Sequence, residues 1–168
     1  TALVPKDVKQ YLETQVYDYP LIKQASVRLP EQPQDIMFIS YDELNADENY
    51  QSLQTRFPHA RRVHGVEGMV NALVRAAEHS TTDWYYAVFA KTEVHKDFAF
   101  DFAPDRFQQP KHYIFHAINV VNDLVYGEMG IILYNRQMVL AGPKQLGIDY
   151  TMSFPNETIP IVLSLIHI

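Results

Sequence analysis

Three short segments with strand character alternate with two amphipathic segments between residues 35 and 89 of this 168-residue chain. They cover residues 35–40, 60–64 and 84–89; the first and the last are apolar runs typical of strands buried on both faces, and the middle one is a short strand that carries two arginines. The intervening segments carry apolar residues at helical spacing, namely Tyr50, Leu53 and Phe57 in the first and Met69, Leu73, Ala76 and Ala77 in the second. This order predicts a strand–helix–strand–helix–strand unit, which forms a parallel sheet with right-handed crossovers.

Polar residues follow two of these apolar segments, at positions where the fold class places ligands. In an open α/β sheet, ligands bind just beyond the carboxyl ends of the strands. Asp42 and Glu43 follow the first strand, and the apolar run that starts at residue 84 stops at Lys91 and Glu93. Asn71 lies near the start of the second helix, just after a glycine-bounded turn. These five residues form the candidate site.

Each candidate also has a structural interpretation, and the sequence leaves both open. Asp42 and Glu43 either bind the base or ribose of a nucleotide, or they are acidic residues stabilised by the positive end of the dipole of the helix that follows. Asn71 either hydrogen-bonds a ligand or bonds the backbone of its own turn. Glu93 either serves as a general base or forms an exposed ion pair with Lys91, which contributes little to stability.

The second half of the chain differs in character from the first. Residues 98–107 are aromatic and acidic, and residues 112–117 and 130–135 are predicted strands. The apolar tail from residue 159 is expected to supply an edge strand. We therefore predict an N-terminal arm over residues 1–34 and a single domain over residues 35–168.

Composition limits the partners of the chain. The formal net charge is −6 and the charges are spread along the sequence, which argues against nucleic acid as a partner. The densest basic cluster, Arg61 and Arg62 with His59 and His64 beside them, is interpreted as a solvated strand edge rather than as a phosphate site. There is no cysteine, so disulfides and thiolate metal sites are excluded. No run has the length of a membrane helix, and no membrane partner is expected.

Residues 65–97 resemble the middle of inverting nucleotide-sugar glycosyltransferases of the GT-A fold. In that family a glycine turn opens a helix with a pattern like A-R-N-x-G-x-x-x-A, and an apolar strand then ends in D-x-D. Asn71, Ala72, Ala76 and Ala77 fit the helix, and residues 35–43, DIMFISYDE, fit the first strand. The resemblance implies a Rossmann-like, mixed, mostly parallel sheet flanked by helices, with a nucleotide-binding half over residues 35–97 and an acceptor-side half over residues 98–168.

A closer resemblance, over residues 35–160, is to glycosyltransferase-like proteins of tailed bacteriophages and marine viral metagenomes. It rests on residues 38–47, 56–65, 110–117, 119–127 and 134–135. It implies a location in the cytoplasm of an infected host cell or in the virion. The chain begins with Thr-Ala, so we expect a fragment whose partners include other domains of a longer protein. The apolar tail and the edge strands also leave a homodimer open.

The sequence departs from the GT-A pattern at the D-x-D motif, whose two acidic positions align with Phe89 and Lys91. The family uses these carboxylates to hold Mn²⁺ or Mg²⁺. Phe cannot ligate a metal ion and Lys repels one, so we expect neither a metal nor another cofactor. The function expected is a degenerate glycosyltransferase-like domain used for binding or assembly. The alternative is a metal-independent glycosyltransferase in which Lys91 stabilises the diphosphate of a nucleotide-sugar.

Two further groups receive structural interpretations. His112 and His116 are four residues apart on a predicted strand, too far to share a metal ion, and His95 joins neither. A set of aromatic residues is assigned to the core rather than to a sugar-stacking platform: Tyr85, Tyr86, Phe98, Phe100, Phe102 and Phe107.

Overall fold

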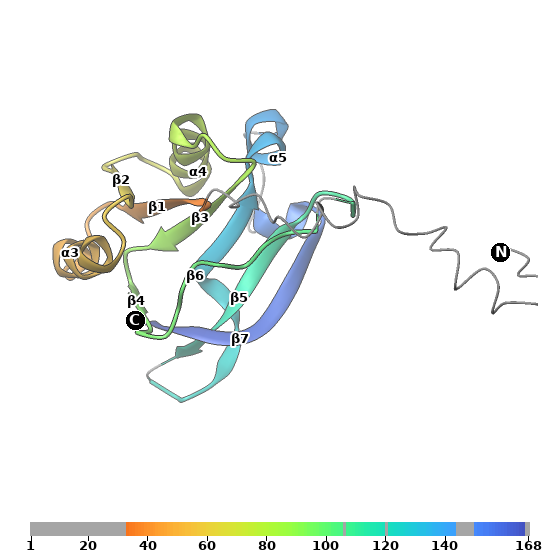
Figure 1. The fold of residues 1–168 in the computed structure, drawn as a ribbon. Coiled ribbons are helices and arrows are strands. Elements are labelled where there is room, and N and C mark those ends of the chain that lie inside the picture. Colours follow the sequence, from red (N-terminus) through yellow and green to blue (C-terminus); the bar gives the residue numbers. More distant parts are fainter. Residues whose placement is uncertain (1–32, 106, 120, 144–149, 167–168) are drawn as a thin grey trace, which may run out of the picture. The chain divides into compact units, whose positions relative to one another are not determined.

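The computed structural model describes residues 33–105, 107–119, 121–143 and 150–166. Of the predicted N-terminal arm, only residues 33 and 34 fall in this range, so the arm lies outside the described residues. Three described strands and two helices make up the first half of the domain (Figure 1): β1 (Asp35–Ser40), α3 (Ala46–Arg56), β2 (Arg61–His64), α4 (Met69–His79) and β3 (Trp84–Phe89). The predicted alternation of strands and helices is confirmed.

The second half adds four more strands to the same sheet. Its described elements are β4 (Thr92–Val94), β5 (His112–Asn119), β6 (Val125–Asn135), α5 (Arg136–Ala141), the 3₁₀ turn η1 (Thr151–Ser153) and β7 (Asn156–Ile166). The strand order is β2-β1-β3-β6-β5-β7-β4. Both strands predicted between residues 112 and 135 are present, and both are longer than expected.

One expectation about strands is wrong, namely that of a C-terminal edge strand. The strand predicted over residues 84–89 is present as β3, and a turn at Ala90 and Lys91 separates it from β4. The Thr92 hydroxyl then donates to the Gly130 carbonyl oxygen at 3.1 Å, which draws β4 toward β6. The C-terminal strand β7 is not at the edge of the sheet, since it pairs with β5 on one side and with β4 on the other.

The sheet is mixed. β1 runs parallel to both β2 and β3, and β5 runs parallel to β7. β6 is antiparallel to its neighbours β3 and β5, and β4 is antiparallel to β7. The predicted fold class, an α/β mixed sheet flanked by helices, is confirmed.

Helices cover both faces of the sheet, with α3 on one face and α4 and α5 on the other (Figure 1). Successive residues of β3 point to opposite faces, so Tyr86 packs in the α3 layer and Tyr85 in the α4 layer. Every residue of β3 is buried. β3 is an interior strand of the sheet, with β1 on one side and β6 on the other.

Most of the aromatic residues assigned to the core are found there. Tyr85, Tyr86, Phe98 and Phe100 are buried, and Phe102 packs against the same layer as Tyr86. Phe107, in contrast, is fully exposed, so its assignment to the core is wrong.

The buried face of α4 differs from its predicted stripe at one position. Leu73, Ala76 and Ala77 are fully buried, as expected. Met69 is 40% exposed because it is the first residue of the helix and lies beyond the ends of the strands.

Candidate functional site

A crevice opens where the chain leaves the parallel strands. β1 leads into α3 on one face of the sheet, whereas β2 leads into α4 on the other. Connections that diverge to opposite faces create a gap beyond the carboxyl ends of the strands, where α/β proteins bind ligands. The strand order β2-β1-β3 places this divergence at the carboxyl end of β1.

A cleft of about 330 Å³ occupies this position. The volume falls at the lower end of the range of small-molecule sites. Its lining comes from the end of β1 and the residues after it, from the β2–α4 connection and the start of α4, and from the last residue of β3. These residues are Ile39, Ser40, Tyr41, Glu43, Val66, Glu67, Gly68, Met69, Ala72 and Phe89.

The β2–α4 connection is shaped by two glycines with positive φ. Gly65 has φ +70° and its amide donates to the Ser40 carbonyl oxygen at 3.1 Å, which ties the connection to the end of β1. Gly68 has φ +86° and ψ 130°, a conformation that favours glycine, and it immediately precedes α4 without a side-chain cap. The start of α4 therefore borders the cleft.

The structure brings Glu43 and Phe89 together at this cleft. Glu43 is half-buried, and its Oε2 accepts a hydrogen bond from the Tyr41 amide at 2.8 Å. Phe89 is 8% exposed and supplies an apolar wall at the first position aligned with D-x-D. One side of the cleft is thus acidic and another is apolar.

The other four candidates do not line the cleft. Asp42 is exposed beside it, and the Asn71 side-chain amide donates to the Glu67 carbonyl oxygen at 2.9 Å. Lys91 and Glu93 are exposed, in the β3–β4 turn and on β4. The turn directs the chain toward β7 and so carries both residues past the cleft.

Among the ten lining residues only Glu43 was a predicted site residue, and the missed ones include Tyr41, Glu67 and Met69. Tyr41 directly precedes the predicted acids, and its position after a buried strand was a usable signal. Glu67 lies inside the glycine-bounded turn and gave no signal of its own. Met69 was assigned to the buried stripe because helical periodicity does not show where a helix extends beyond the sheet.

A second polar group lies at the carboxyl end of β2. The Arg62 guanidinium donates from Nε to Ser40 Oγ at 2.8 Å and from Nη1 to Asp47 Oδ1 at 2.6 Å. Its Nη2 approaches His64 Nδ1 at 3.5 Å, and Ser40 Oγ lies 3.0 Å from the same nitrogen. Arg62 is consequently not part of a solvated strand edge, because only 21% of its side chain is exposed.

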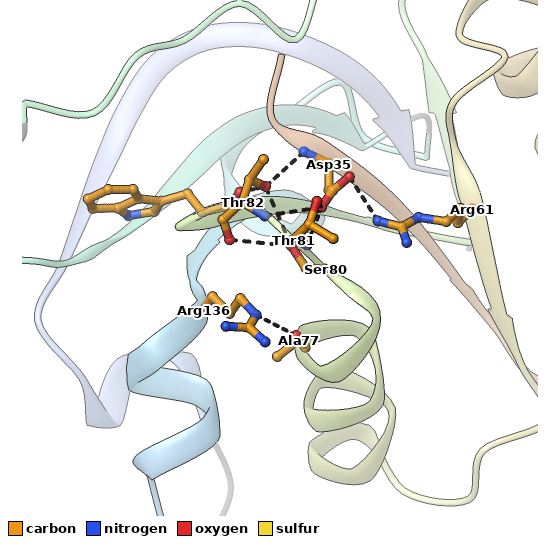
Figure 2. Close-up of polar contacts among 8 residues, drawn as sticks. Asp35, Arg61, Ala77, Ser80, Thr81, Thr82 and Arg136 are labelled. Atoms are coloured by element: carbon orange, nitrogen blue, oxygen red, sulfur yellow. Dashed lines mark hydrogen bonds and ion pairs between the residues drawn. The ribbon is translucent and has the colours of Figure 1, made fainter. Parts of the chain in front are cut away.

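The amino ends of the strands carry a different polar network (Figure 2). Asp35 Oδ2 accepts hydrogen bonds from the Ser80 hydroxyl, from the Thr81 hydroxyl and amide, and from the Thr82 amide, and its Oδ1 pairs with Arg61 at 2.8 Å. Burial raises the pKa of the Asp35 carboxyl, but these hydrogen bonds and the Arg61 charge outweigh burial and hold the pKa below 3.8. The network joins β1, β2 and the segment before β3.

His112 and His95 are not among the residues that line the cleft. His112 is fully buried between Tyr134 and Phe154, and its Nδ1 accepts from the Asn135 amide at 3.1 Å. Burial lowers the pKa of His112 to about 4. His95 lies 3.5 Å from Asp97, on the exposed segment after β4. Within the described ranges, no three His, Asp or Glu side chains are grouped closely enough to hold a metal ion.

Comparisons with known proteins give limited matches. No protein-family model and no curated protein matches the chain. A solved glycosyltransferase involved in the glycosylation of the major capsid of PBCV-1 is similar at 10% identity and a TM-score of 0.39, over 62% of each chain. HddC from Yersinia pseudotuberculosis is similar at 12% identity and a TM-score of 0.40, over 74% of this chain and 68% of HddC. The chain thus spans less than two thirds of the length of the PBCV-1 enzyme.

No helix in the described part of the chain is both long enough and apolar enough to span a membrane.

Proposed function

We propose that this chain is a glycosyltransferase-like domain that binds the nucleotide of a nucleotide-sugar without a metal ion and serves binding or assembly in a longer viral protein. The observation that carries the proposal is the cleft at the carboxyl end of β1, with Phe89 as its wall. The viral context follows from the sequence resemblance, which also suggested the class of ligand.

The chemistry of the cleft suits a nucleoside. Ile39, Val66, Ala72 and Phe89 offer apolar surface to a flat base. Glu43 adds a carboxylate, which accepts hydrogen bonds from ribose hydroxyls or base N–H groups. Apolar walls with a few polar groups are typical of small-molecule sites.

Metal independence is supported by the side chain at the end of β3. Phe89 offers no ligand atom, and it fills the position where the GT-A pattern has the first carboxylate of D-x-D. Lys91, at the other D-x-D position, carries a positive charge. A divalent cation therefore lacks both of the ligands that the pattern would supply.

The alternative function is metal-independent sugar transfer, with the Lys91 ammonium stabilising the diphosphate and Glu93 near the acceptor. One observation favours it. The turn that carries Lys91 is held in place, because the Ala90 amide donates to the Ile39 carbonyl oxygen and the Asn49 side-chain amide donates to the Ala90 carbonyl oxygen. A fixed turn gives Lys91 a defined anchor point beside the end of β1.

A binding assay tests the proposal. Thermal shifts measured with UDP-, GDP- and CMP-sugars, each with Mn²⁺ and with EDTA, report binding through the stabilisation of the folded state. We expect one donor class to raise the melting temperature equally in both buffers. A shift that requires Mn²⁺ would contradict metal independence, and no shift with any donor would contradict nucleotide binding.

Two matched variants locate the binding. Glu43→Gln removes a charge that lines the cleft, whereas Glu48→Gln removes one from the exposed first turn of α3. We expect only the first variant to weaken nucleotide binding, by about five- to tenfold. The alternative function would be favoured if the unaltered chain released nucleoside diphosphate from a bound nucleotide-sugar and the Lys91→Ala variant did not.

A further inference from the structure

The Arg62 guanidinium is fixed by groups other than its acidic partner. Nε is bound by the Ser40 hydroxyl, and Nη2 faces His64 Nδ1. The guanidinium carbon lies 5.5 Å from the centre of the Tyr50 ring and 5.9 Å from that of Phe38, within the range of cation–π contacts. These contacts hold the cation in one place whether or not Asp47 is present.

Asp47 is held much less firmly. Its side chain is 79% exposed, and its Oδ1 accepts a hydrogen bond from Arg62 Nη1 at 2.6 Å. A solvated carboxylate paired with a fixed, half-buried guanidinium exchanges readily with another anion, because the new anion inherits a pre-positioned donor. The pair thus combines a stationary cation with a replaceable anion.

We propose that Arg62 forms an anion subsite for a phosphoryl or carboxylate group of the ligand, and that Asp47 occupies this subsite as an intramolecular competitor. The ligand anion takes over the bond from Nη1 while Nε stays with Ser40. Asp47 then turns into solvent. The competition weakens anion binding, and it selects ligands that hold the anion with additional contacts.

Ser40 connects the subsite to the cleft. Its hydroxyl binds Arg62, and the same residue borders the cleft at the end of β1. Arg62 lies over Phe38 and Tyr50 in the α3 layer, whereas the apolar lining of the cleft belongs to the α4 layer, so Ser40 is the residue that the subsite and the cleft share. Where the anion is the diphosphate of a nucleotide-sugar, the inference rests on the proposed function, but anion binding by Arg62 does not depend on it.

NMR titration of the full chain with inorganic pyrophosphate tests the subsite. We expect weak binding to the unaltered chain, binding about tenfold tighter in Asp47→Asn, and loss of binding in Arg62→Gln. Arg61→Gln is the matched control, since it removes the neighbouring positive charge of β2 but leaves Arg62 and Asp47 in place. We expect this control to stay within about twofold of the unaltered chain.

Two results would overturn the inference. Equal affinities in Asp47→Asn and the unaltered chain would show that Asp47 does not compete, and equal losses in Arg61→Gln and Arg62→Gln would show a response to net charge alone. Asp47 is exposed, so its variant remains informative even where Arg62→Gln fails to fold.

Parallel titrations with uridine and UDP separate this inference from the proposed function. Binding of uridine that Asp47→Asn leaves unchanged, together with tighter UDP binding, would place the diphosphate at Arg62. Tighter pyrophosphate binding without any nucleoside binding would support the subsite and contradict the proposed function. Nucleoside binding without any change in pyrophosphate affinity would support the proposed function and contradict the subsite.

Discussion

The two ends of β1 are built in opposite ways. At the amino end, Asp35 is enclosed by donors from Ser80, Thr81 and Thr82 and by Arg61, so each carboxylate oxygen is satisfied within the chain. At the carboxyl end, the strand opens onto a cleft with an apolar wall and a carboxylate from Glu43. Satisfied polar groups stabilise a fold, whereas an open cleft leaves groups available to a ligand. The difference predicts that the amino end contributes to stability, and it is consistent with the binding role proposed for the carboxyl end.

The largest expected effect is at the amino end. Asp35→Ala removes an acceptor shared by two backbone amides and two hydroxyls, and it leaves Arg61 without its ion-pair partner. We expect the free energy of unfolding to fall by about 3 to 4 kcal/mol, because partly buried donors lose their partner. Urea denaturation followed by circular dichroism measures this change.

Asp42→Ala is the control at the carboxyl end. Asp42 is exposed, and its loss is expected to change the unfolding free energy by less than about 0.5 kcal/mol. Comparable losses of unfolding free energy in Asp35→Ala and Asp42→Ala would contradict the view that the amino end of β1 contributes more to stability than the carboxyl end.

The pH dependence of stability offers a second test, because His112 also begins a strand at the amino edge of the sheet. Its pKa is about 4 in the folded state and 6.5 in the unfolded state. Above pH 6.5 both states are neutral and the residue has no effect. Between pH 6.5 and 4 only the unfolded state gains the proton, so stability falls by up to about 3 kcal/mol.

His112→Asn removes this titration while keeping a side-chain acceptor for the Asn135 amide. Urea midpoints measured from pH 7 to pH 4 are expected to fall steeply in the unaltered chain and much less in the variant. Asp35 adds a loss at lower pH, because its pKa is depressed and its stabilisation disappears as it protonates below pH 3.8. Parallel pH profiles for the variant and the unaltered chain would refute the assignment to His112.

Local sequence patterns predicted the parallel half of the fold well. The apolar strands and the amphipathic helices over residues 35–89 are set by periodicity within each segment, which a sequence displays directly. The apolar run predicted the end of β3, but it did not predict that the chain forms a further strand, β4, after the turn at Ala90 and Lys91. Bonds with distant residues position β4, such as the one from Thr92 to Gly130. The position of β7 within the sheet likewise depends on pairing with strands remote in sequence.

The candidate site was predicted only in part, for the same reason. The rule that ligands bind at carboxyl ends of strands led to Glu43 and to Phe89, which both line the cleft. The rule does not say where the chain turns after a strand ends, so it also selected Lys91 and Glu93, which the β3–β4 turn carries past the cleft. Which residues line a cleft depends on the direction that the backbone takes after each strand. The residue types along the sequence do not show this direction.

At the cleft end, a loss of stability smaller than those expected at Asp35 and His112 is predicted for Gly68. An added Cβ would lie 3.4 Å from the Asn71 side-chain nitrogen, an ordinary contact, so the cost of Gly68→Ala arises from the backbone at φ +86° and ψ 130°. We expect a loss of about 1 to 2 kcal/mol in unfolding free energy, together with weaker nucleotide binding because Gly68 lines the cleft.

Gly65→Ala is the matched control. Gly65 also has a positive φ and an added Cβ there would meet no atom within 4 Å, but Gly65 is not among the lining residues. Chemical denaturation and nucleotide titration of both variants are expected to show similar stabilities but reduced affinity only in Gly68→Ala. Equal nucleotide affinities in the two variants would show that the start of α4 does not contact the ligand. They would contradict the assignment of the nucleotide site to this cleft.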